Sequence, residues 1–112
     1  MDAEAESPLR QFVRIEAQVQ LLLREVSLQD LSRDALKQLD LIRRGNERTR
    51  SLLKEYESQE NTATMSRLLQ QAVGQLETLK KYILDASEHG VFSAADVAFL
   101  TAHLEQLIER LE

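Results

Sequence analysis

The chain has no cysteine, no tryptophan, one proline and three glycines among its 112 residues. Without cysteine, disulfides, thiolate metal sites and a cysteine nucleophile are excluded, and this absence fits a reducing compartment. With so little glycine and proline, few positions can form tight turns or interrupt regular structure. The sequence therefore predicts long, continuous elements of secondary structure.

Long apolar runs are also missing, since no segment approaches the ~18 residues needed to cross a bilayer. Residues 1–7 are acidic and lack the basic start and apolar centre of a signal peptide. The net charge of −5, from 14 basic and 19 acidic side chains, disfavours attraction to nucleic acid and to anionic membranes. We expect a cytoplasmic protein that binds neither.

What the chain has in abundance is leucine, glutamine, glutamate, arginine and alanine, which all favour helix. Valine and isoleucine are scattered rather than set in alternating runs, so no segment is typical of a strand. We predict an all-α fold, an antiparallel up-down helical bundle of about four helices, with three long helices plus a C-terminal helix. Residues 1–7 are expected to form an acidic flexible tail, and residues 8–112 a single domain.

Capping signals mark the helix ends. Ser7 and Pro8 are typical of a helix start, and this first helix should run to about Val26. Residues 27–30 have the spacing of a capping box, with Ser32 as a competing cap. Residues 57–62 carry no apolar side chain and predict a loop.

The last connection gives the strongest local signal. Gly90 after His89 is typical of a helix C-terminus. Ser93 and Asp96 then have the form of a capping box, and Phe92 can pack on Val97 as a hydrophobic staple. A final helix should therefore begin here.

Apolar stripes at spacings of three and four residues predict which helix faces are buried. The stripe of the second helix contains two polar residues, Asn46 and Thr49, directly after Gly45. A buried Asn can set register or oligomeric state, the stripe can be half exposed there, or the patch can be a docking site. Gly45 predicts either a kink or a close approach. In the third helix the predicted stripe is Met65, Leu69, Ala72, Leu76, Leu79, Ile83 and Ala86.

Signals of catalysis are sparse. His89 lies at a helix C-terminus, where the helix dipole favours a cation, and neither His89 nor His103 has the Glu-x-x-His spacing of di-metal bundles. No glycine-rich phosphate loop or nucleophile elbow is present. The acidic residues are all predicted to lie on solvated faces. We therefore expect a protein that is not an enzyme and needs no metal or cofactor.

The basic segment 43–54 is the sharpest local feature, and its candidate interaction residues are Arg43, Arg44, Asn46, Arg48, Thr49 and Arg50. One interpretation is a site for nucleic acid or another anionic ligand. The other is a solvated helix face balanced by Asp40 and Glu47, with Asp40 placed to pair with Arg44. The arginines spread around the helix, and no aromatic residues interleave with them to stack on bases. This favours the second interpretation.

Several apolar residues lie outside or beside the predicted stripes: Leu9, Val13, Leu23, Leu41, Leu52, Leu68, Val73, Phe99 and Ile108. Apolar surface left over after folding marks a partner site. We therefore expect a non-enzymatic protein–protein interaction module, such as an adaptor, small chaperone or regulatory subunit. Self-association as a homodimer is its simplest form. The alternative is binding of nucleic acid or an anionic ligand through residues 43–54.

Overall fold

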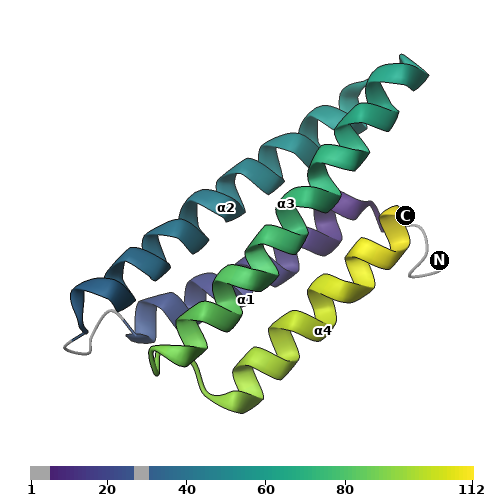
Figure 1. The fold of residues 1–112 in the computed structure, drawn as a ribbon. Coiled ribbons are helices and arrows are strands. Elements are labelled where there is room, and N and C mark those ends of the chain that lie inside the picture. Colours follow the sequence, from purple (N-terminus) through teal and green to yellow (C-terminus); the bar gives the residue numbers. More distant parts are fainter. Residues whose placement is uncertain (1–5, 27–30) are drawn as a thin grey trace.

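A computed structural model describes residues 6–26 and 31–112. The elements in this part of the chain are four α-helices: α1 (Pro8–Val26), α2 (Arg33–Ser58), α3 (Thr62–Glu88) and α4 (Ala94–Leu111). They run alternately up and down (Figure 1), which confirms the predicted all-α, up-down bundle. The middle two helices, with 26 and 27 residues, are the long ones, and α1 and α4 have 19 and 18.

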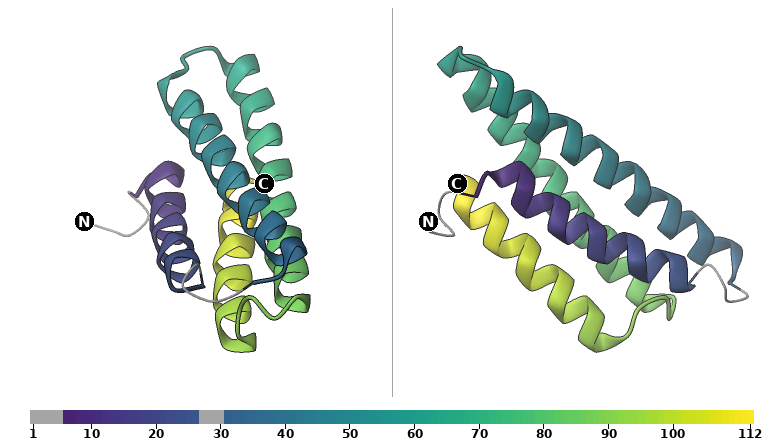
Figure 2. Two further views of the ribbon diagram at one scale, coloured as in Figure 1. Left: turned by 90° about the vertical axis from the view of Figure 1, so that its left-hand side faces the viewer. Right: turned by 180° about the vertical axis from the view of Figure 1, so that it is seen from behind.

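Each helix packs against its neighbours in a ring. α2 packs on α3, α3 on α4 and α4 on α1, and α1 closes the ring against α2, while the diagonal pairs make no close backbone approach among the described residues. Figure 2 shows the long α2–α3 hairpin extending past the ends of α1 and α4. The bundle measures 47 × 28 × 19 Å. The core is therefore the space enclosed by all four helices.

Helix N-termini begin where the capping residues predict. The hydroxyl of Ser7 accepts a hydrogen bond from the backbone N–H of Arg10, and Ser32 and Ser93 cap α2 and α4 in the same way. Asn61 caps α3, so the predicted loop shortens to residues 59–61. The competing cap at residues 27–30 lies outside the described residues. These side chains supply acceptors to N–H groups that have no partner within their helix.

The α3 C-terminus follows the predicted glycine stop. Gly90 has a φ of 74°, a left-handed conformation that only glycine adopts without strain. The N–H of Val91 donates to the carbonyl of Ala86, and that of Gly90 to Ser87, which together form a Schellman motif. Phe92 and Val97 are both buried beside the following cap, as expected for a hydrophobic staple.

Most members of the predicted stripes are buried. The two polar members, whose burial the sequence left open, are buried as well. Asn46 and Thr49 are 3% and 0% exposed, and the Thr49 hydroxyl donates to the carbonyl of Gly45 at 2.8 Å. The start of α3 differs from the prediction, because Leu68 is buried whereas Met65 and Leu69 are only half-buried. The largest fully buried side chains are Phe12, Leu39, Ile42, Leu53, Leu76, Leu79, Ile83, Leu100, Leu104 and Leu107.

Gly45 marks a close approach and not a break. α2 continues through it, and the side chain of Leu79 from α3 lies over the missing side chain. A Cβ atom built on Gly45 would lie 2.6 Å from Leu79 Cδ2. Glycine therefore lets the two long helices pack tightly at their middle.

The chain near residue 6 is tied to two helices. The Glu6 carboxylate pairs with Arg14 at 2.7 Å, and its carbonyl accepts a hydrogen bond from Arg110 of α4. Residues 1–5 of the expected tail lie outside the described residues. None of the described helices is both long and apolar enough to cross a membrane.

Candidate binding cleft between α1 and α2

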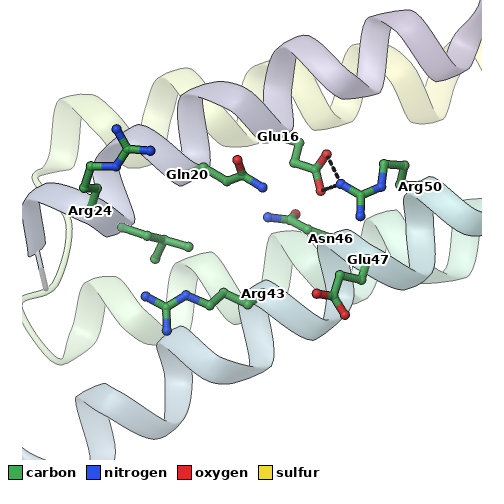
Figure 3. Close-up of a pocket in the computed structure, with 8 residues that line it drawn as sticks. Glu16, Gln20, Arg24, Arg43, Asn46, Glu47 and Arg50 are labelled. Carbon is green, nitrogen blue, oxygen red and sulfur yellow. Dashed lines mark hydrogen bonds and ion pairs between the residues drawn. The ribbon is translucent and has the colours of Figure 1, made fainter.

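A polar cleft of about 370 Å³ lies between α1 and α2. The two helices run antiparallel, so residue pairs 16/50, 20/46 and 24/43 lie at successive levels along it (Figure 3). Both helices contribute charged side chains of both signs. The cleft is lined by Glu16, Gln20, Leu23, Arg24, Arg43, Asn46, Glu47 and Arg50.

A buried ion pair closes one end of the cleft. Arg50 Nη1 donates to both carboxylate oxygens of Glu16, at 2.9 and 3.1 Å. The side chain of Glu16 is 5% exposed and that of Arg50 is 45% exposed. The prediction that every acidic residue lies on a solvated face is therefore wrong for Glu16. A carboxylate can be buried here because a guanidinium from the next helix neutralises it and hydrogen-bonds to it.

Asn46 lies at the centre of the cleft and carries an unpaired donor. Its side chain reaches from α2 toward α1, below Gln20 and Glu16 (Figure 3). The Nδ2 atom is buried and has no hydrogen-bond partner among the described residues. An unpaired buried amide costs about 1–3 kcal/mol of folding free energy. Buried polar groups without a partner are uncommon in folded proteins, so Asn46 is a candidate for contact with a group outside the chain.

Arg43 extends the basic side of the cleft. It lies one helical turn from Asn46, at the level of Arg24. Within residues 6–26 and 31–112, Arg43 forms no ion pair, so its guanidinium is available to an incoming group. Glu47 is exposed at the same rim and leaves the cleft with three arginines and two glutamates.

Only three of the six candidate residues from the sequence meet in the cleft: Arg43, Asn46 and Arg50. Arg44 faces solvent and pairs with Asp40 at 3.0 Å, which confirms the predicted i, i+4 pair. Arg48 lines a separate groove between α2 and α3. Thr49 is enclosed in the core and cannot reach a partner. The basic segment is therefore divided among different faces of α2.

The sequence analysis missed Glu16, Gln20, Leu23, Arg24 and Glu47 as residues of the cleft. A signal for Glu16 is present: it lies between Phe12 and Val19 in a second three-four stripe. That stripe is Leu9, Phe12, Glu16, Val19, Leu23 and Val26, and all its members from Phe12 onward are buried. A charge inside an apolar stripe indicates a buried partner on the facing helix.

The lining of the cleft holds guanidinium, amide and carboxylate groups, and no hydroxyl, thiol, imidazole or amine. The guanidinium and amide groups supply hydrogen-bond donors, and the carboxylates supply acceptors that can also act as bases. Among the described residues, no three His, Asp or Glu side chains gather as metal ligands would.

The two histidines serve local structure. His89 is the C-cap of α3. The ring of His103 lies against Phe99, with centroids 4.1 Å apart, and its Nδ1 lies 2.7 Å from the carbonyl oxygen of Phe99. Neither residue lines the cleft.

No protein-family model matches this chain, and no curated protein or solved structure matches it either. The functional inference therefore depends on the geometry of the cleft.

Proposed function

We propose that this protein is a non-enzymatic interaction module and that the cleft between α1 and α2 is where it binds a protein partner. The observation that carries the proposal is the buried, unpaired Nδ2 of Asn46, which faces a cavity with a free arginine beside it. A partner that supplies an acceptor to Asn46 Nδ2 forms the missing hydrogen bond and so offsets the cost of burying this amide unpaired.

The apolar face expected from the sequence is a weaker basis for binding. Of the nine surplus apolar residues, Leu23, Leu68 and Ile108 are buried, and Leu9, Leu41, Leu52 and Val73 are half-buried. Val13 and Phe99 are the two exposed ones, at 42% and 48%. Val13 lies near the start of α1 and Phe99 near the start of the antiparallel α4, so they lie toward opposite ends of the bundle. The proposed partner site therefore moves from an apolar face to the polar cleft.

Binding of nucleic acid is disfavoured by the division of the basic segment. Arg50 neutralises Glu16, Arg44 pairs with Asp40, and Arg48 faces another groove. A duplex backbone is bound by several cations aligned on one face, each neutralising a phosphate.

A cytoplasmic location, expected from the cysteine-free sequence, remains part of the proposal.

Self-association is proposed through α1 and α4. Gln11 accepts a hydrogen bond from Arg110 at 2.7 Å, which sets the register of these antiparallel helices and places Leu21 and Phe99 at the same level. Both side chains are about half exposed, at 47% and 48%. Two such residues on neighbouring helices favour a weak, two-fold contact.

Site-specific photo-crosslinking tests the partner site. A photoreactive amino acid replaces Gln20 in the cleft, and in a control it replaces Gln106, which is exposed on α4. In native cells we expect the probe at position 20 to capture a defined protein and the probe at position 106 to capture none. Addition of Arg43→Glu to the first variant should abolish capture. Equal capture at both positions, or none at position 20, would contradict the proposal.

A further inference from the structure

The internal ion pair of the cleft leaves one cation uncompensated. Glu16 and Arg50 neutralise each other, whereas the Arg43 guanidinium forms no ion pair within residues 6–26 and 31–112. An incoming anionic group would give Arg43 the counter-charge that Arg50 already has.

The unpaired donors of the cleft indicate that its ligand supplies hydrogen-bond acceptors. Asn46 Nδ2 offers N–H groups from a fixed, buried position, and the Arg43 guanidinium offers planar N–H groups one turn away. Both need acceptors and neither is an acceptor itself. A carboxylate has two oxygens in one plane, matches the guanidinium geometry and can bridge an arginine and an amide.

Arg50 shows that the cleft already holds one carboxylate in this manner. The carboxylate of Glu16 is 5% exposed and accepts two hydrogen bonds from a single guanidinium nitrogen. Asn46 and Arg43 lie next along α2, and within the described part of the chain the Asn46 Nδ2 and the Arg43 guanidinium have no such acceptor. The cleft therefore has two adjoining sets of hydrogen-bond donors. Arg50 is paired with the carboxylate of Glu16, whereas Asn46 Nδ2 and Arg43 have no acceptor among the described residues.

We propose that the cleft binds a carboxylate between Asn46 and Arg43, and that in the partner this group is the side chain of an aspartate or glutamate. This inference rests on the proposed function, since it names the chemistry by which the same site recognises its partner.

Nuclear magnetic resonance of the side-chain amide of Asn46 tests the chemistry directly. The full chain is titrated with sodium acetate and with a capped tetraglutamate peptide, and sodium chloride at equal ionic strength is the reference. We expect both carboxylates, but not chloride or a tetraglutamine peptide, to shift the Asn46 Nδ2 resonances in a saturable way. Saturation by the peptide at lower concentration than by acetate supports an acidic segment as the source. If acetate binds more tightly than the peptide, the acidic segment is overturned as the source, and a small-molecule carboxylate is the ligand.

Two variants and a control test the assigned residues. Arg43→Gln and Asn46→Leu should each weaken binding about tenfold, which corresponds to the loss of one charge-assisted hydrogen bond. For Asn46→Leu, binding is followed through the backbone amides of Gln20 and Glu47. Arg44→Gln removes an equally charged neighbour outside the cleft and should leave binding unchanged. An equal loss in all three variants would show unspecific charge attraction and overturn the site.

The outcomes separate this inference from the proposed function. Inorganic phosphate that shifts Asn46 where carboxylates do not would overturn the ligand class. Crosslinking at position 20 without any response of Asn46 to carboxylates would support the partner site but overturn the proposal that the partner is recognised through a carboxylate. Failure of both measurements would overturn both proposals.

Discussion

The carboxylate of Glu16 on α1 and the guanidinium of Arg50 on α2 form an ion pair across 34 residues of sequence. Since Glu16 is almost completely buried, its charge depends on this one partner within the described residues. The pair is therefore both a link between the two helices and the wall of the cleft.

Arg50→Met leaves the Glu16 carboxylate buried without its counter-charge. Breaking a fully buried pair costs 3–5 kcal/mol, and because Arg50 is half exposed we expect a smaller loss, about 2 kcal/mol of unfolding free energy. Urea denaturation followed by circular dichroism measures it. The double variant Glu16→Leu with Arg50→Met should recover most of the loss, since no charge stays buried. A double variant no more stable than Arg50→Met would contradict this account.

Asn46→Leu removes the unpaired amide while keeping a side chain of similar size. We expect the variant to gain about 1 kcal/mol of unfolding free energy, because the desolvation cost of the amide disappears. Thermal and urea unfolding provide the measurement. A clear loss of stability would show that the amide has a stabilising partner in the free protein.

Gly45 and Gly74 form a matched pair for alanine substitution, since both lie inside long helices. Alanine at position 74 meets nothing within 4 Å and should gain about 1 kcal/mol from helix propensity. Alanine at position 45 gains the same propensity but places its Cβ against Leu79, where overpacking costs about 1–3 kcal/mol. We expect Gly45→Ala to be the less stable variant by at least about 1 kcal/mol. Equal unfolding midpoints would argue against close packing of α2 and α3 at Gly45.

Phe99→Lys tests self-association. We expect the wild-type protein to dimerise in a concentration-dependent way in sedimentation velocity, and Phe99→Lys to shift the equilibrium toward the monomer. The charged side chain removes apolar contact area and introduces like charges across a two-fold axis. Leu84→Lys, a similarly exposed leucine on α3, is the control and should leave the equilibrium unchanged. A wild-type protein that stays monomeric at every concentration would exclude the proposed dimer.

Local signals account for what the sequence predicted well. The caps at Ser7, Ser32 and Ser93 act within one turn of the chain, and so does the left-handed Gly90. These interactions need no knowledge of the tertiary structure, which is why the helix bounds follow the prediction closely.

The cleft depends on information that is not local. The pairing of Glu16 with Arg50, and the position of Asn46 opposite Gln20, follow from the register between α1 and α2. That register is set by packing along both helices. The division of Arg43, Arg44 and Arg48 among faces does follow from the helical period of 3.6 residues, and the sequence predicted it on that basis.

The ring of helices also has a consequence for the order in which the protein forms during synthesis. The face of α1 that borders the cleft finds its partner in α2 once about half of the chain has been made. The opposite face of α1, which carries Gln11, waits for Arg110 at the far end of the chain. During synthesis, α2 is therefore available to pack against the first helix before α4 is.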